Sequence, residues 1–396
     1  MEKRIAALAL ALIPGLGACS AAIAVQESEK QSMTIAKLNK SQVRFTERLL
    51  DRITAAAPTD NVFVSPLSIN LALSMLREGA KGTSRTEINT ALGSDSLSSE
   101  EWSSVLPMLK SPNILISNGL WTSKQYSVNN SFIEALQQRF SAEAEGINFE
   151  NDDAAEHINK WITNSTKGMI PGQLTPMALR NQVLFLINAI AFEDTWQTQF
   201  MPDGNEKGTF ALAGGKTSPV TYMNRFLFIP YKKYSSYESV SLSYVTSGYA
   251  MNIILPSPGV TPMAALKKAI SGTAKPTQTL NQGMVTIPKW EGRATYDLKK
   301  ILSGMGLNSI FQGGEANLSG IGSKQGDYFV SSIVHRTFVQ VNESGTKAAA
   351  TTEIMLGSAG IPVTDFHFKA DRPFAYTLTG PHGELLFVGI MNNPAL

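Results

Sequence analysis

The side chains that most often carry catalysis or hold metals are few and scattered in this sequence. Among 396 residues there are one cysteine and four histidines, His157, His335, His367 and His382, and no HExxH or CxxC spacing occurs. The nucleophile motif G-x-S-x-G is missing too, because the nearest stretch, Gly357-Ser358-Ala359-Gly360, has the wrong spacing. Gly320-Ile321-Gly322 is not completed as a dinucleotide fingerprint. We therefore expect no metal, no cofactor and no catalytic activity.

The composition is that of an ordinary folded protein. Hydrophobic residues make up 43% and charged residues 17% of the chain, which excludes disorder for most of its length. Lysine and arginine number 34 against 32 acidic residues, a net charge of +2. So small an excess provides no strong field for a polyanion, and nucleic acid is not an expected partner.

The amino end has the pattern of a secretion signal. A charged start, Glu2-Lys3-Arg4, precedes the apolar stretch Ile5 to Ile13, which is too short to span a membrane. Residues Leu16-Gly17-Ala18-Cys19 resemble the lipobox of bacterial lipoproteins, and Cys19 is the only cysteine. We expect residues 1–19 to be a signal peptide and Cys19 to be lipidated in a bacterial protein. An ordinary signal cleaved after Ala22 or Ala24 is the alternative.

Residues 20–41 are expected to be a polar tether, since they are rich in Gln, Glu, Ser and Lys. With a lipid on Cys19, the tether would hold a soluble body at the cell envelope, and we favour the outer membrane. Without the lipid, the protein would be released outside the cell. Contact with the membrane would be through the lipid only.

The remaining chain predicts an α+β fold around one large sheet system. Phe45, Leu49, Leu50, Ile53 and Ala57 lie on one face of a helix, and Ser65-Pro66 caps a second helix that is apolar nearly all round. Four apolar runs later in the chain predict strands: 183–187, 251–255, 283–287 and 385–390. Helices lead and strands dominate later, which differs from a repeating βαβ order.

The segment from Glu343 to Pro362 has an unusual pattern for a loop. Its simplest interpretation is a surface loop of small residues. However, the alternate residues Thr346, Ala348 and Ala350 are small and uncharged, followed at the same spacing by Thr352, Ile354 and Leu356, while the charges fall on the intervening positions. This period of two is typical of a half-buried strand.

From about residue 42 to the end, the chain resembles the serpin family. The family's motifs occur in order and in register. They are Asn61-Val62-Phe63-Val64-Ser65-Pro66-Leu67-Ser68-Ile69, Gly79-Ala80-Lys81-Gly82-Thr83, Leu186-Ile187-Asn188-Ala189 with Phe192, Trp196 and Phe200, Ala316-Asn317-Leu318-Ser319-Gly320, His335, Glu343 with Gly345-Thr346-Lys347, Asp371-Arg372-Pro373-Phe374, and Asn393-Pro394.

The resemblance implies a single domain, residues 42–396, of about nine helices and three sheets, with an exposed reactive-centre loop over about 344–362. In this family a serine protease cleaves the loop, and the segment before the cut inserts into the main sheet while the protease is still acyl-linked. The hinge that begins insertion would comprise Glu343, Gly345, Thr346, Lys347, Ala348, Ala349, Ala350, Thr351 and Thr352. Counting along the family pattern places the cleaved bond between Ala359 and Gly360, within one residue.

Two further sets of residues take their roles from the resemblance. Asn61, Ser65, Ser68, Asn188, Trp196 and His335 match the family's structural cluster where the sheet opens, and we expect hydrogen bonding rather than catalysis from the polar members. The segment 98–112, where heparin-activated members carry basic residues, has Glu100, Glu101 and only Lys110. We expect no heparin cofactor, and we expect the protein to be a monomer.

These residues together predict an inhibitor that acts as a suicide substrate. A small residue at the cleaved bond suits an elastase-like serine protease, or another protease that accepts small residues. A non-inhibitory member acting as a binding or chaperone protein is the alternative, and a secreted hydrolase is a remote third.

Overall fold

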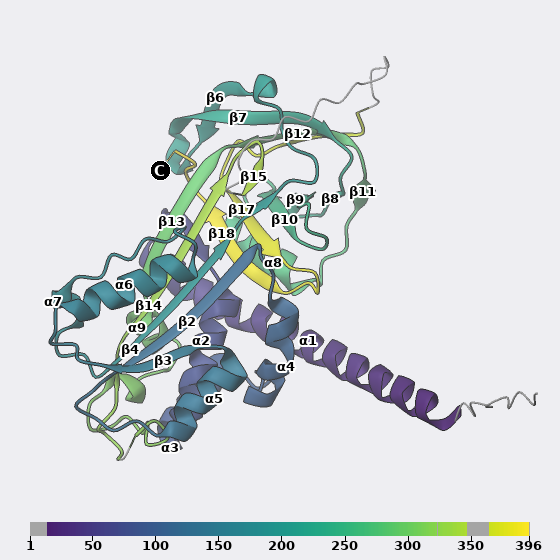
Figure 1. The fold of residues 1–396 in the computed structure, drawn as a ribbon. Coiled ribbons are helices and arrows are strands. Elements are labelled where there is room, and N and C mark those ends of the chain that lie inside the picture. The colour runs from purple at the N-terminus through teal and green to yellow at the C-terminus, as the bar shows by residue number, and fades with distance from the viewer. Residues whose placement is uncertain (1–13, 323, 347–363, 396) are drawn as a thin grey trace, which may run out of the picture.

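Nine helices and three sheets make up the part of the chain that the structure describes (Figure 1). This computed structural model describes residues 14–322, 324–346 and 364–395, and only the backbone of residues 14–24. The helices are α1 (Pro14–Ala56), α2 (Pro66–Gly79), α3 (Gly82–Leu92), α4 (Ser99–Leu109), α5 (Asn130–Phe140), α6 (Asp153–Ser165), α7 (Pro176–Leu179), α8 (Pro262–Ser271) and α9 (Leu298–Ser303).

One of the two seven-stranded sheets, called the main sheet below, has the order β3-β2-β4-β14-β15-β5, with β13 paired to β14 as well. Its strands are β3 (Glu143–Ile147), β2 (Ile114–Ser123), β4 (Leu184–Phe192), β14 (Val330–Val341), β15 (Gly345–Thr346), β5 (Asp194–Thr195) and β13 (Trp290–Asp297). Strands β4 and β14 run parallel and are bonded directly to each other from Leu184 and Val330 to Ala191 and Phe338. This β4–β14 seam lies near the centre of the sheet.

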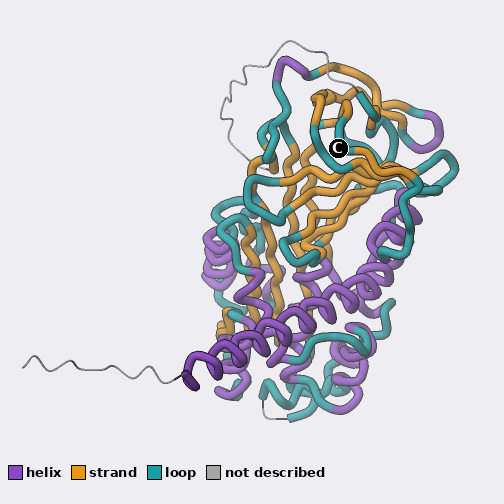
Figure 2. Tube along the Cα trace, turned by 90° about the vertical axis from the view of Figure 1, so that its right-hand side faces the viewer, coloured by secondary structure: helices purple, strands orange, loops and turns teal. Residues whose placement is uncertain are grey.

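Two other sheets complete the fold. The second sheet has the order β1 (Val62–Val64), β18 (Leu385–Met391), β17 (Phe374–Thr379), β10 (Ala250–Pro256), β9 (Tyr237–Ser243), β8 (Tyr231–Lys233) and β11 (Gln278–Leu280). The small sheet has the order β16 (Phe366–Lys369), β12 (Gly283–Pro288), β7 (Thr217–Leu227) and β6 (Glu206–Ala211). Figure 2 shows the strands running through the upper part of the molecule, with most of the helices below and beside them.

Both faces of the main sheet are covered, which explains why β4 reads as a continuous apolar run. Leu184, Leu186 and Ile190 belong to the large core that includes α2, whereas Phe185 and Ile187 pack with α6 in a second core. Helix α2 is buried almost throughout, and Ser65 caps it by accepting a hydrogen bond from the Ser68 amide. The predicted strands at 183–187, 251–255, 283–287 and 385–390 are confirmed as β4, β10, β12 and β18. The α+β fold is confirmed with them.

Helix α1 changes the expected start of the packed body. Residues 20–41, expected as a polar tether, are helical, and the packed body begins at about Thr34 instead of residue 42. Ile35 and Leu38 are buried because they continue the face of Phe45 and Leu49 by two further turns. Residues 25–33 are all exposed, and this part of α1 projects away from the body (Figures 1 and 2). In the described residues no helix has both the length and the apolar character needed to cross a membrane.

Candidate functional site

The start of the expected hinge forms a short strand at one end of the main sheet. After β14, the Asn342 side chain accepts hydrogen bonds from the amides of Ser344 and Gly345, at 3.0 and 3.2 Å, and turns the chain back. Gly345 and Thr346 then form β15, which pairs with Val341 of β14 on one side and with β5 on the other. The hinge therefore begins inside the main sheet, in line with the strand pattern of this segment.

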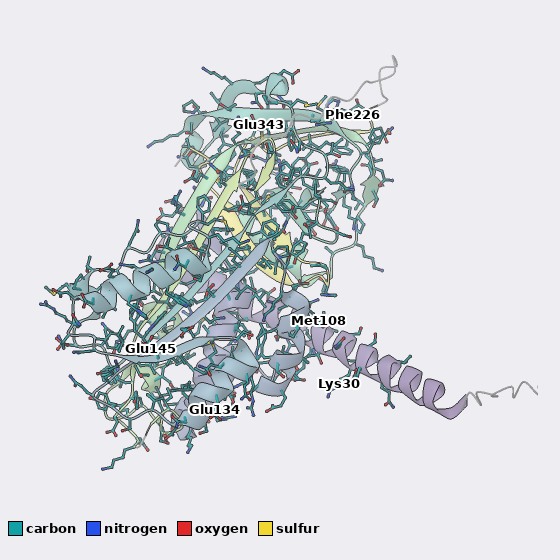
Figure 3. The ribbon with its side chains drawn as sticks, in the orientation of Figure 1. Lys30, Met108, Glu134, Glu145, Phe226 and Glu343 are labelled. Carbon is teal, nitrogen blue, oxygen red and sulfur yellow. The ribbon has the colours of Figure 1, made fainter. Side chains whose placement is uncertain are left out.

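Glu343 is fixed at this turn by three contacts. Its carboxylate pairs with Lys289 and accepts a hydrogen bond from Asn205 Nδ2 at 2.5 Å, and its carbonyl accepts one from the Phe200 amide at 2.9 Å. Burial raises the pKa of Glu343, but the hydrogen bonds from Lys289 and Asn205 outweigh it and hold the pKa below its ordinary value. Figure 3 labels Glu343 at the upper end of the molecule. The ionised carboxylate thus fastens the chain immediately before the hinge.

Thr346 is buried against an aromatic pair. Its hydroxyl lies 2.6 Å from the Tyr244 hydroxyl, and only 1% of the residue is exposed. Trp196 stacks on Tyr244 with ring centroids 4.4 Å apart and donates its indole N–H to the Asn342 carbonyl at 2.9 Å. Burial raises the pKa of Tyr244, so it remains a neutral hydroxyl. Trp196 therefore packs where the hinge enters the sheet, whereas Tyr244 carries no motif that could have marked it in the sequence.

Gly345 is required by the close approach of β5. Its φ is +152°, and a Cβ atom at this position would lie 2.2 Å from the Asp194 carbonyl oxygen. Only glycine fits between the two strands without moving one of them.

Four of the expected cluster residues meet behind the β4–β14 seam. Asn188 of β4 and His335 of β14 are directly opposite each other, and the His335 Nδ1 lies 2.8 Å from Asn188 Oδ1. Ser68 of α2 donates its hydroxyl to the same Oδ1, and Asn188 Nδ2 donates to the Ser68 carbonyl at 3.1 Å. The Ser65 amide donates to His335 Nε2 at 3.1 Å. These bonds join both strands of the seam to α2.

The contacts of His335 define its protonation state. Because Nε2 accepts from the Ser65 amide, the ring proton is on Nδ1 and points at Asn188 Oδ1. The ring is completely buried, and burial lowers the pKa of His335 to about 3. A neutral imidazole with both nitrogens engaged has a structural role, since no substrate could reach it.

Two residues alter the expected membership of this cluster. Asn118 of β2 was not expected, yet its Oδ1 accepts from Asn188 Nδ2 at 2.7 Å and extends the row across a third strand. Asn61 was expected in the cluster but lies elsewhere: its Oδ1 accepts from the amides of Asn392 and Asn393, and its Nδ2 donates to the Asn393 carbonyl. Asn61 therefore fixes the end of β18 beside β1.

The rest of the expected site falls outside the described residues. Lys347, Ala348, Ala349, Ala350, Thr351 and Thr352 of the hinge and the bond between Ala359 and Gly360 belong to this part, and so does the side chain of Cys19. Within the described residues no group of His, Cys, Asp or Glu is arranged to hold a metal ion.

Comparisons with known proteins agree on one family. The model of the family "Serpin (serine protease inhibitor)" matches residues 40–394. A leukocyte elastase inhibitor of Equus caballus is 30% identical over 381 residues, covering 90% of this chain and all of that protein. Serine protease inhibitor 42Dd of Drosophila melanogaster is 30% identical over 346 residues, covering 84% of this chain and 91% of the relative.

Solved structures agree on the fold. Native tengpin, a thermophilic serpin, superposes with a TM-score of 0.79 at 24% identity, covering 90% of this chain and 94% of tengpin. Human thyroxine-binding globulin with its hormone superposes with a TM-score of 0.78, also at 24% identity, covering 91% of this chain and 99% of that one.

Proposed function

Because the chain belongs to the serpin family of serine protease inhibitors, we propose that it traps a serine protease as a suicide substrate of its own loop. The family is one of inhibitors and not of catalysts, and relatives of this chain are named as inhibitors. Cleavage would fall after about Ala359, and the segment before it would enter the β4–β14 seam as a new strand.

The observation that carries this proposal is the position of Thr346. This residue already lies between β14 and β5, buried and hydrogen-bonded to Tyr244. Insertion continues from this point by burying Ala348 and Ala350, which are small and uncharged. A charged side chain at Ala348 or Ala350 would lose several kcal/mol of solvation when insertion buries it and would slow insertion until the acyl-enzyme hydrolysed.

The proposed target is an elastase-like serine protease. Ala359 at the cleaved bond suits a shallow specificity pocket, and no Lys or Arg occurs between Glu353 and His367 to attract a trypsin-like enzyme. The likeness to leukocyte elastase inhibitors supports this assignment. Ala359→Arg should move inhibition to trypsin, and continued elastase inhibition without trypsin inhibition would show that the bond is elsewhere.

One gel tests the mechanism. The mature protein is mixed with pancreatic elastase, and an SDS-resistant band at the summed mass of the two chains is expected. Ala350→Arg should give the cleaved protein and no such band, while Met177→Ala, an exposed change on α7, should behave as the wild type. Cleavage of the wild type without a trapped complex would favour the alternative, a non-inhibitory binding protein. Persistence of the band in Ala350→Arg would contradict the insertion step.

We also propose that the protein is held at a bacterial cell envelope by a lipid on Cys19. The exposed residues 25–33 of α1, which are polar or charged from Gln26 to Ser32, would then separate the lipid from the body. Metabolic labelling with radioactive palmitate should mark the wild type and not Cys19→Ala. An unlabelled wild type found only in the medium would favour the ordinary signal peptide.

A further inference from the structure

Two arginines line a small cleft on the α6 side of the main sheet. Arg293 of β13 is paired with Phe338 of β14, and Thr295 of β13 is paired with Arg336 of β14. Because side chains alternate along a strand, all four share one face of the sheet. Residues 169–171 and 173, which follow α6, close over this face and leave a cleft of about 60 Å³. Figure 1 shows α6 lying against the main sheet.

The guanidinium of Arg336 is buried without a matching charge. Only 8% of the residue is exposed, and its Nη1 donates to the Pro171 carbonyl at 3.2 Å. Within the described residues, Nη1 is the only one of its three nitrogens that forms a hydrogen bond. The edge formed by Nε and Nη2 is therefore unused, and this edge of an arginine can bind both oxygens of a carboxylate. Burial lowers the pKa of Arg336, as expected for a charge that lacks a counter-ion.

Arg293 brings a second positive charge to the cleft. Its guanidinium lies over the Phe338 ring, 4.4 Å from the centroid, and its Nε donates to Glu291 Oε1 at 2.9 Å. Glu291 also accepts from Gln340 Nε2 and lies outside the cleft, and the residues that line the cleft include no aspartate or glutamate. Two arginines thus share one nearby carboxylate, and one positive charge is left in excess.

We propose that this cleft binds one small carboxylate anion between Arg293 and Arg336. The two guanidiniums supply charge-assisted donors, which form the strongest hydrogen bonds to a carboxylate. The volume favours a free anion of a few heavy atoms, such as formate or acetate, because drug-sized ligands need roughly 300 Å³ or more. The anion would link β13 and β14 to the segment after α6 and would stabilise the intact protein. The site uses no residue of the reactive-centre loop, so it does not depend on the proposed function.

The test compares the melting midpoint of the intact protein in 50 mM sodium acetate with that in 50 mM sodium chloride. With a dissociation constant of about 1 mM, acetate should raise the wild-type midpoint by about 2–4 °C relative to chloride. Arg336→Met should abolish this difference and Arg293→Met should reduce it. Arg336→Lys should retain less than half, because an ammonium keeps the charge but has no planar fork. Arg52→Met, at an exposed arginine of α1 outside the cleft, is the matched control and should keep the full difference.

The outcomes are separable from general effects of salt and of misfolding. An equal rise in the wild type and in Arg336→Met, or no rise in the wild type, overturns the site. Because Arg336→Met removes a buried charge, it should melt above the wild type in chloride, so poor folding would not explain a lost response.

A blocked peptide with a single glutamate tests a second source of the carboxylate, the side chain of a partner. A response at concentrations similar to acetate or higher supports the free anion. The same rise at a tenfold lower concentration than acetate, again lost in Arg336→Met, would keep the carboxylate site but overturn the free anion as its occupant.

Discussion

Behind the β4–β14 seam, every polar atom of the Asn188 side chain has a hydrogen-bond partner. Its Oδ1 accepts hydrogen bonds from the Ser68 hydroxyl and from the His335 Nδ1–H, and its Nδ2 donates to the Ser68 carbonyl and to Asn118 Oδ1. Such a buried network is stabilising only when complete, because each orphaned group loses its solvation. The seam is thus fastened by polar groups that would have to change partners if another strand entered, as the proposed function requires. His335 and Arg336, neighbours on opposite faces of β14, lead to different predictions.

His335 should make the protein sensitive to acid. Its pKa is about 3 when folded and about 6.5 when unfolded, so its contribution is complete above pH 6.5 and is lost as the pH falls toward 3. In this window the free energy of unfolding should fall by up to about 1.4 kcal/mol per pH unit. His335→Gln keeps a donor for Asn188 and an acceptor for Ser65 without titrating. Urea midpoints at pH 7.5, 6.0 and 4.5 should therefore decline less for the variant, and parallel declines would contradict the role of His335.

Arg336 should lower the free energy of unfolding of the intact protein. It is 8% exposed, its Nη1 donates to the Pro171 carbonyl at 3.2 Å, and Nε has no partner in the described part of the chain. Burial lowers the pKa of Arg336, and among the described residues no carboxylate pairs with it. Arg336→Met should therefore raise the free energy of unfolding by roughly 1–2 kcal/mol. Differential scanning calorimetry compares the melting midpoint of this variant with that of Arg52→Met, a change at an exposed arginine of α1 that should alter stability little. A lower midpoint for Arg336→Met would show that the charge is compensated.

At the scale of elements, β15 is the part of the site that depends most on exact fit. Gly345→Ala places a Cβ atom against the Asp194 carbonyl and should force β15 out from between β14 and β5. We expect a loss of roughly 1–3 kcal/mol in stability and a shift in the fluorescence of Trp196, whose indole contacts the same turn. Gly313→Ala is the control, because its Cβ atom would meet only the Phe329 ring, at an ordinary contact distance of 3.5 Å. If both variants had the same Trp196 emission and the same melting temperature, the missing side chain of Gly345 would not be needed to hold β15 in place.

The elements were predictable where burial leaves a mark on the sequence. Strand β4 is covered on both faces and α2 is buried nearly all round, so their apolar runs revealed them. The pairing of strands leaves no such mark, because register depends on contacts between distant segments. Asn118 and Tyr244 were therefore missed, and Asn61 was assigned to the wrong neighbours. The early start of the packed body was missed because Ile35 and Leu38 stand among polar residues that suggest a tether.

At the scale of the whole molecule, the proposed mechanism requires a second arrangement of the chain, which would differ from the described one at the β4–β14 seam. In the described arrangement the two strands are bonded directly, and the polar row joins them to α2. The hinge occupies only the end of the sheet, at Gly345 and Thr346. Opening the seam breaks the bonds between β4 and β14, and a strand placed between them would restore one set of bonds on each side. The proposed second arrangement would have more backbone pairing than the first, so it would be the more stable of the two.

Cleavage of the loop should therefore raise thermal stability. Each new backbone hydrogen bond contributes on the order of 1 kcal/mol, and several kcal/mol correspond to a rise of at least about 10 °C in a domain of this size. Calorimetry measures this change when the protein is compared before and after cleavage by a protease that it does not trap. Hydrogen exchange of the β4 and β14 amides should be slower after cleavage. Cleaved Ala350→Arg is the control, because insertion would have to bury its guanidinium, and its melting should stay where it was. Equal melting of intact and cleaved wild type would mean that the seam never opens, and the proposed trap would then have no driving force.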